Sequence, residues 1–236
     1  MRFTKTQMNR SNTTALSLFH AGPSYGAWQK YDAHRPMNLA SCCGAFPVSG
    51  NVVTRCHNNG TLIMSFSLYD AVVPSNLQIL GAIDALLDKA EGFCTAQGRA
   101  AAELIDARLA PDMLPFGYQV KSCVGHSIGG IEGVKAGSFS PDTAAWPTDF
   151  AGLHHAVQTA IISLKAIERE SFDALADADT MFAFGETKMP FTGANFLLSF
   201  SQPNFYFHAS IAYAILRAQG VKLGKRDFMG MPRIKR

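Results

Sequence analysis

The sequence predicts an all-α fold, a four-helix bundle with a small β-hairpin before the last helix. Four long segments repeat apolar residues at intervals of three, four and seven positions, which is the spacing of one helix face. One long connection separates the second segment from the third, and a short alternating segment, residues 180–191, precedes the fourth. Because each helix has one apolar stripe to bury, we expect the four helices to pack against one another as a bundle.

Residues 1–63 form a separate part of the chain, and residues 64–236 are expected to form the bundle domain. The first part mixes Ser, Thr, Asn, Gly, Arg and His with scattered apolar residues and has no sustained period, which predicts a poorly ordered N-terminal extension. It is either a mitochondrial presequence, acid-poor with Arg and Ser, or an upstream extension of the reading frame before a start at Met64. The second interpretation is favoured because ordered-looking sequence begins at Met64. It places the protein in the cytoplasm, whereas a presequence places it in mitochondria.

The first long helix is expected over residues 70–97. Gly98 supplies a stop, and we place Pro74 near the first turn, where a missing amide hydrogen costs little. A short helix over residues 99–108 follows and ends before a proline-rich turn that carries Asp112. The apolar stripe of the long helix consists of Val73, Leu77, Leu80, Leu87 and Cys94.

A second long helix is expected over about residues 115–134, and it carries His126 well off the middle of its apolar stripe. Three glycines share the side of His126, and each weakens a helix by roughly 1 kcal/mol relative to alanine. Small residues beside a histidine indicate either a close neighbouring helix or room for a ligand. The sequence leaves both open for Gly129, Gly130 and Gly133.

A third helix is expected over about residues 149–169, with Thr148 as its N-cap. His155 points away from the apolar face of this helix and is expected in solvent. His154 lies at the edge of that face, either as a boundary residue or as a site residue.

The segment before the fourth helix predicts a hairpin. Residues 180–191 are too short and too alternating for a helix, and Gly185 and Glu186 are suited to the turn. Thr192 and Gly193 then open the last helix.

The fourth helix is expected to extend to Gly220 and to be interrupted at Pro203, because an interior proline costs a helix about 3 kcal/mol and kinks or breaks it. The bend falls immediately before Asn204 and His208 and frees backbone carbonyls there. His208 is a titratable ring in an otherwise almost continuously apolar or aromatic segment. Asn204 lies one turn earlier on the same face, so the two side chains are expected to converge.

Composition excludes several classes of function. Residues 1–63 carry a formal charge of +5 and residues 64–236 carry −2, so the basic balance of the chain gives no argument for nucleic-acid binding. The sequence contains no run of eighteen apolar residues, so no transmembrane helix is expected. It also has no GxSxG elbow, phosphate-binding glycine loop, HExxH or Rossmann motif. Five cysteines without a CxxC pair indicate reduced, intracellular thiols.

Four segments, in this order and spacing, resemble a branch of the DinB/YfiT-like superfamily made up of domains of unknown function. They are SLYDAVVP (67–74), ARLAPDMLPFGYQV (107–120), FTGANFLLSFSQPNFYFHASIAYAILR (191–217) and GVKLGKRDFMG (220–230). The resemblance spans about residues 65–230. It implies a four-helix bundle that often forms homodimers, and better-known relatives of this branch bind a divalent metal with three histidines.

The resemblance also implies which residues form a site. One histidine comes from the second helix and two, spaced HxxxH, come from the last, so the positions correspond to His126, Asn204 and His208. Asn204 departs from the pattern, because an amide oxygen is a weaker ligand for zinc or nickel than an imidazole. Water or Asp112 is an alternative source of the remaining ligands.

Two functions follow as expectations from the resemblance and these residues. The first is a metal- or histidine-assisted enzyme of the thiol-transferase or isomerase class that acts on a small organic molecule, with His126, His208 and Asp112 as catalytic candidates. The alternative is a non-catalytic protein that binds a small ligand at a degenerate metal site.

Overall fold

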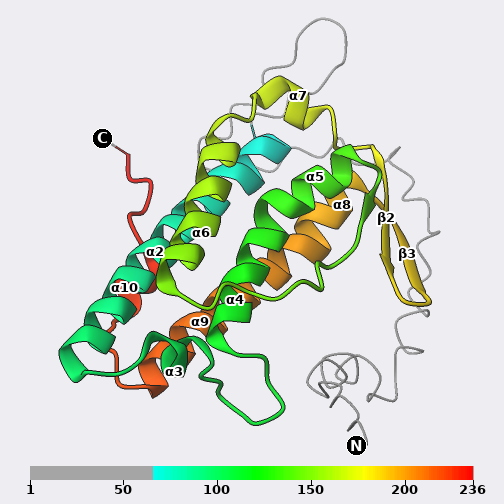
Figure 1. The fold of residues 1–236 in the computed structure, drawn as a ribbon. Coiled ribbons are helices and arrows are strands. Elements are labelled where there is room, and N and C mark those ends of the chain that lie inside the picture. The colour runs from blue at the N-terminus through cyan, green and yellow to red at the C-terminus, as the bar shows by residue number, and fades with distance from the viewer. Residues whose placement is uncertain (1–65, 236) are drawn as a thin grey trace, which may run out of the picture. The chain divides into compact units, whose positions relative to one another are not determined.

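The computed structural model describes residues 66–235, so the expectations for residues 1–63 lie outside the described residues. Four long helical segments lie side by side in it (Figure 1). They are α2 (Leu68–Gln97); α4 (Phe116–Val124) continued by η3 (Gly125–Gly129) and α5 (Gly130–Lys135); α6 (Phe150–Lys165); and α8 (Gly193–Asn195) continued by η4 (Phe196–Ser201) and α9 (Gln202–Ala218). Both η3 and η4 are π-helical.

The four long segments pack into a bundle around one apolar core. Helix α4 packs on α9 and α6, and α2 packs on α6 and α9, so each segment has two neighbours. The predicted four-helix bundle is confirmed. Every long segment contributes large, fully buried side chains, among them Leu80, Phe116, Leu153 and Phe205.

Helix α2 begins and ends at strong sequence signals. Ser67 caps it by accepting a hydrogen bond from the Asp70 amide, and Gly98 ends it with a left-handed φ of 63°. The predicted stripe is confirmed, since Val73, Leu80, Leu87 and Cys94 are buried and Leu77 is partly buried against the core. Pro74 was misplaced: the helix begins at Leu68, so this proline lies inside it, beyond the first turn.

Two of the three glycines beside His126 are explained by a close neighbouring segment. A Cβ on Gly130 would collide with the Ser201 hydroxyl of the facing helix, and one on Gly133 would lie 2.8 Å from Cβ of Phe139. These two positions are therefore glycine because another segment passes close to the helix. A Cβ on Gly129 would meet only the backbone carbonyl of Val124, at 3.8 Å.

Helix α6 begins one residue later than expected. Asp149, and not Thr148, is the N-cap, because the carboxylate oxygen of Asp149 accepts a 2.7 Å hydrogen bond from the Gly152 amide. The apolar face of this helix is buried at Phe150, Leu153, Val157 and Leu164, and His155 is exposed as expected. Within residues 66–235, three further short helices are present: α3 (Ala101–Ile105), α7 (Arg169–Asp173) and α10 (Lys225–Met229).

A three-stranded sheet covers one end of the bundle beside α5 and α8 (Figure 1). Strands β2 (Asp179–Phe184) and β3 (Thr187–Thr192) form the predicted hairpin, and Gly185 adopts a φ of 56° in its turn. Strand β1 (Ser138–Phe139) pairs with β2 in parallel and was not predicted. Two residues give too little alternation to be recognised as a strand.

The fourth segment is continuous through Pro203. Thr192 caps its start, and the irregularity expected at the proline takes the form of the π-helical η4, after which Pro203 stands in the first turn of α9. Gly220, with a φ of 95°, follows the end of α9. The predicted break at Pro203 is therefore wrong, and the irregular part of the segment is the π-helical turn before the proline.

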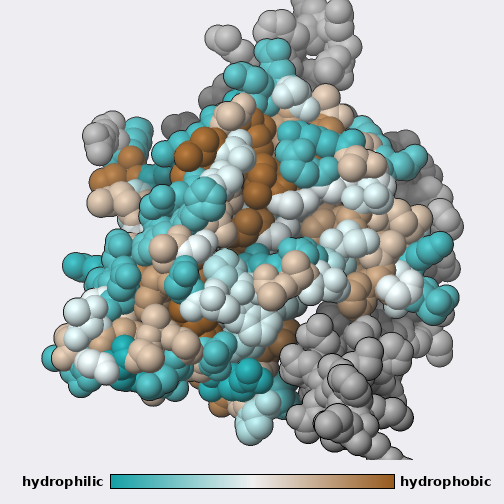
Figure 2. Space-filling view, in the orientation of Figure 1, coloured by the Kyte–Doolittle hydropathy of each residue, from teal (hydrophilic) through white to brown (hydrophobic). Residues whose placement is uncertain are grey.

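The surface and interior match ordinary globular composition. Hydrophilic side chains cover much of the face in Figure 2, and a strip of hydrophobic surface lies between α6 and α5. Cys94 and Cys123 are buried free thiols. Among residues 66–235, no helix combines the length and the hydropathy that crossing a membrane requires.

Candidate functional site

The structure brings His126 and His208 together from two facing segments. His126 lies in η3 and His208 in α9, and these segments pack against each other. The ring centroids are 5.7 Å apart and the ring planes differ by 11°. Two titratable rings that are distant in sequence are therefore neighbours inside the bundle.

Gln119 of α4 fixes the orientation of His208. The Gln119 side chain is buried, and its Nε2 donates a 2.8 Å hydrogen bond to the Leu114 carbonyl. Its Oε1 is then left to face His208 Nδ1, at 2.8 Å. Because an amide oxygen can only accept, the Nδ1 of His208 carries the proton and Nε2 keeps the lone pair. A ligating histidine is typically held in this way.

Both imidazoles are neutral near pH 7. Burial lowers the pKa of His208 from 6.5 to about 4. Burial, and then the neighbouring His208, lower the pKa of His126 to about 4 as well. A neutral imidazole has one nitrogen lone pair, which suits it to bind a metal ion or to accept a proton.

His126 stands between aromatic rings. Phe139 of β1 lies 5.6 Å from it and Phe200 of η4 lies 6.0 Å from it, measured between centroids. Its Nδ1 atom is buried without a hydrogen-bond partner among the described residues. A buried nitrogen without a partner costs free energy, and such groups often mark a site where something else binds.

Two π-helical segments meet at the histidines. His126 lies in η3, and η4 ends directly before the helix that carries His208. Ser201 at the end of η4 donates a 2.8 Å hydrogen bond to the backbone carbonyl of His126, which ties the two segments together. π-Helical turns are costly and occur frequently at functional sites.

Aromatic side chains also surround His208. Tyr118 lies 5.9 Å away at an angle of 73°, and Trp146 lies 6.0 Å beyond Tyr118 at 88°. Phe207, next to His208 in sequence, is 56% exposed. The described surroundings of the pair are therefore mainly aromatic and uncharged.

Asn204 and Asp112 do not lie in hydrogen-bonding contact with the histidines in the described structure. The Nδ2 of Asn204 donates a 2.7 Å hydrogen bond to the Phe200 carbonyl, four residues earlier. The Oδ1 of Asn204 is therefore the atom left for any ligand. Asp112 is exposed in the turn before α4.

The pair offers a divalent ion two imidazole ligands. Two imidazoles that share one zinc ion through bonds of about 2.0–2.1 Å have centroids about 5–6 Å apart. The observed separation of 5.7 Å agrees with this geometry. Within residues 66–235 there is no group of three or more His, Cys, Asp or Glu side chains placed to hold an ion. Any metal here would depend on two histidines, a neutral amide and water.

His154 belongs to a different face of the bundle. Its Nδ1 lies 2.6 Å from a carboxylate oxygen of Asp84 in α2, and its Nε2 lies 3.5 Å from Asp88. Because the two carboxylates face opposite nitrogens of one ring, this cluster links α6 to α2 and is unsuited to chelate one ion. His154 is therefore a boundary residue between two helices.

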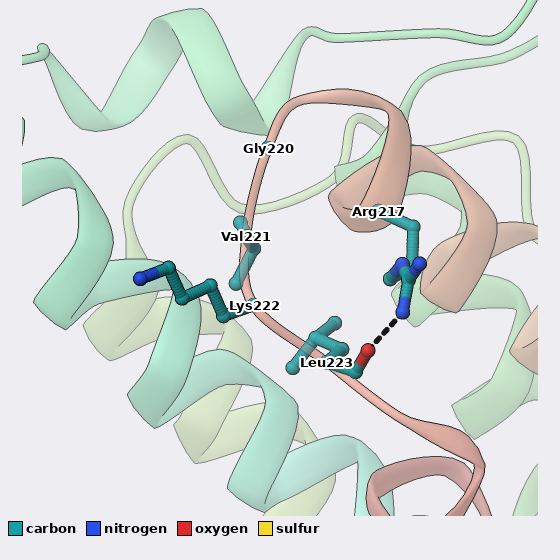
Figure 3. Close-up of a pocket in the computed structure, with 5 residues that line it drawn as sticks. All are labelled: Arg217, Gly220, Val221, Lys222 and Leu223. Atoms are coloured by element: carbon teal, nitrogen blue, oxygen red, sulfur yellow. Dashed lines mark hydrogen bonds between the residues drawn. The ribbon is translucent and has the colours of Figure 1, made fainter.

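A shallow hollow at the end of α9 is separate from the histidines. Arg217, Gly220, Val221, Lys222 and Leu223 line it, and the Arg217 guanidinium donates a hydrogen bond to the Leu223 carbonyl (Figure 3). Arg217 lies nine residues beyond His208, which is about 13 Å along the helix axis. Figure 3 shows Lys222 extending away from Arg217, so the hollow gathers no convergent polar groups.

Three contributors to the site could not be assigned from sequence. Gln119 interrupts the apolar run around Phe116 and Val120 and is buried, which was the available signal. Phe139 and Trp146 carried no such signal, because they stand in a connection without periodicity.

Comparisons with known proteins identify the relatives of the chain. The family model described as domain of unknown function (DUF1993) matches residues 68–229. The chain is similar to a solved structure, a DinB family member protein from Shewanella denitrificans, with 27% sequence identity and a TM-score of 0.61. That match covers 72% of this chain and 95% of the other. None of the curated proteins matches the chain.

Proposed function

This chain belongs to the DUF1993 family of domains of unknown function and has a DinB-like fold, and from that premise we propose that His126 and His208 bind one divalent metal ion, zinc or nickel. The site assists a reaction on a small organic molecule.

One observation carries this proposal: a buried amide presents the lone pair of His208 beside a second neutral histidine. Gln119 holds Nδ1 of His208 at 2.8 Å, and the two rings are 5.7 Å apart. Both have a pKa of about 4, so neither needs to lose a proton to bind an ion near pH 7. Removing protons from ligands usually opposes metal binding, and that cost is absent here.

The bound ion would supply a Lewis acid that lowers the pKa of a coordinated water or thiol. His126 and His208 would hold it, and Asn204 Oδ1 would complete or orient the shell. Both histidines are half-buried among aromatic rings. The family resemblance favours thiol transfer or isomerisation among the reactions that such a site assists.

A second function is favoured by the weakness of the donor set. The described residues hold no cluster of three strong ligands, and Asn204 offers a neutral amide. A non-catalytic protein that binds a small ligand between aromatic rings and neutral histidines needs no metal. The homodimer implied by the resemblance is a further prediction, which the oligomeric state in solution tests.

Metal titration of the metal-free, untagged full-length protein distinguishes the two functions. Calorimetry with zinc and then nickel should show one ion per chain, and His126→Ala and His208→Ala should each abolish that binding. His155→Ala is the matched control, because His155 is exposed on α6 and should leave the affinity unchanged. Binding that survives His208→Ala, or that is missing from the wild type, would overturn the metal site and favour the ligand-binding protein.

A further inference from the structure

The connection between β1 and α6, residues 140–148 and here called the strap, passes over α4 beside the histidine pair. Both ends are held. Ser140 Oγ donates a 2.7 Å hydrogen bond to the Ala183 carbonyl of β2, and Asp149, which follows the strap, caps α6. Most of the strap is exposed, whereas Trp146 and Pro147 are partly buried. The strap is thus fixed at its ends and has one large side chain turned inward.

Lys121 of α4 holds the middle of the strap. Its Nζ lies 3.0 Å from the Asp142 carbonyl, 3.0 Å from an Asp142 carboxylate oxygen, and in hydrogen-bonding contact with the Ala144 carbonyl. The side chain of Lys121 is 14% exposed, so these contacts replace most of its water. The Ala144 amide and then the Lys121 ammonium lower the pKa of Asp142. Three acceptors around one ammonium make a point of attachment between α4 and the strap.

Trp146 occupies a space that α4 leaves open for it. A Cβ on Gly117 would lie 2.5 Å from Cδ1 of Trp146 and 2.9 Å from Cγ2 of Ile105, so any other residue at position 117 would have to displace the indole and press on Ile105. The indole then meets the Tyr118 ring edge-on at 6.0 Å. Glycine at 117 thus lets the strap press an aromatic ring directly against Tyr118.

Tyr118 contacts both Trp146 of the strap and His208 of the pair. Its ring lies 5.9 Å from that of His208, and the next residue, Gln119, holds His208 Nδ1. One turn of α4 therefore contacts the strap through Gly117, Tyr118 and Lys121, and contacts His208 through Tyr118 and Gln119. The strap and His208 therefore contact the same turn of α4 from two sides.

We propose that the strap supports the binding site: Trp146 of the strap, together with Tyr118 and Lys121 of α4, are positioning residues that keep His208 aligned, and they thereby set the affinity of the His126–His208 pair for its metal ion. This inference rests on the proposed function. It adds that affinity is controlled from a connection that contains no ligand.

Zinc affinity and two spectroscopic signatures of the full-length protein test the role of the strap. Lys121→Met removes the attachment, and Lys121→Arg is the conservative variant that should restore it. Gly117→Ala displaces Trp146, and Gly81→Ala is its matched control, because a Cβ on the exposed helical Gly81 meets nothing within 4 Å. The chain has two tryptophans, so a Trp28→Phe background lets fluorescence report Trp146 alone.

We expect Lys121→Met and Gly117→Ala to weaken zinc binding about threefold or more, in the manner of supporting residues around a site. Both should shift the Trp146 emission and the ring NMR signals of His208, while Lys121→Arg and Gly81→Ala match the wild type. Unchanged zinc affinity in Lys121→Met, with Trp146 emission shifted, would overturn the inference. If the wild type binds no zinc, the proposed function is wrong, but the role of the strap is still tested by NMR. In that case, unchanged ring signals of His208 in Lys121→Met and Gly117→Ala would overturn the role of the strap as well.

Discussion

Gln119 and His208 are 89 residues apart in sequence and are joined by a 2.8 Å hydrogen bond between α4 and α9. Both polar ends of the Gln119 amide are used, one on the Leu114 carbonyl and one on the imidazole. This buried amide has a single favourable orientation, because reversing it would place its oxygen against the Leu114 carbonyl oxygen, and both of these atoms can only accept. The tautomer of His208 follows from that orientation.

Gln119→Leu should weaken zinc or nickel binding about 10- to 100-fold, the usual effect of losing the partner that orients a ligating histidine. Leucine has a similar volume but accepts no hydrogen bond, so His208 loses its fixed tautomer. Calorimetry measures the affinity, and ¹⁵N NMR of the imidazole reports the tautomer. Gln119→Glu keeps an acceptor and should retain the Nδ1–H form; a Leu variant with wild-type affinity and tautomer would contradict the assigned role.

The metal-free protein should lose stability as the pH falls from about 6.5 to 4. Both histidines have a lowered folded pKa, about 4 against 6.5, so the unfolded chain binds more protons in this window. Each histidine then lowers the free energy of unfolding by up to about 1.4 kcal/mol per pH unit. Urea unfolding at several pH values measures the slope.

His208→Gln provides the comparison for this pH dependence. It removes one titrating group, so the fall between pH 6.5 and 4 should be shallower than in the wild type. His155→Gln, at an exposed position, should leave the slope unaltered. Equal slopes in all three proteins would show that His208 is not buried as a neutral ring.

Asn204→His should tighten zinc binding about tenfold or more, because an imidazole is a much stronger ligand for zinc than an amide oxygen. Position 204 lies one turn before His208, so a histidine there restores the HxxxH spacing. Asn204→Ala separates this gain from loss of the hydrogen bond to the Phe200 carbonyl. Unchanged zinc affinity in the histidine variant would mean that position 204 does not face the ion.

Gly130→Ala should lower the free energy of unfolding by about 1–3 kcal/mol, the usual cost of overpacking a close contact. The added Cβ would collide with the Ser201 hydroxyl, which also donates to the His126 carbonyl. Gly125→Ala in the same helix meets nothing within 4 Å and should be neutral or stabilise by up to about 1 kcal/mol. Chemical denaturation compares the two, and equal stabilities would contradict the close approach of η3–α5 to η4.

The helices and the hairpin were predictable because their signals are local. The stripe of α2, the cap at Thr192 and the turn at Gly185 each depend on residues within a few positions of one another. The meeting of His126 with His208 needed a family resemblance, since periodicity alone shows only which face each residue occupies.

The features that could not be predicted from the sequence depend on contacts between segments that are distant along the chain. Gln119 pairs with His208 across 89 positions, and Trp146 depends on the absence of a side chain at Gly117. The N-cap was assigned to Thr148 because Thr and Asp are both good caps at adjacent positions, and only the fold selects Asp149. The periodicity of apolar residues carries no information about these contacts or about which of two adjacent caps is used.

The π-helical η4 has a consequence for how this chain tolerates insertion and deletion. In an α-helix each residue turns the chain by about 100°. Removing one residue between Phe196 and Ser201 would let the segment relax to α-helical pairing, but everything after it, His208 included, would rotate by that angle relative to the hairpin. Chain length in this one turn, and not only residue identity, therefore determines whether the two histidines face each other.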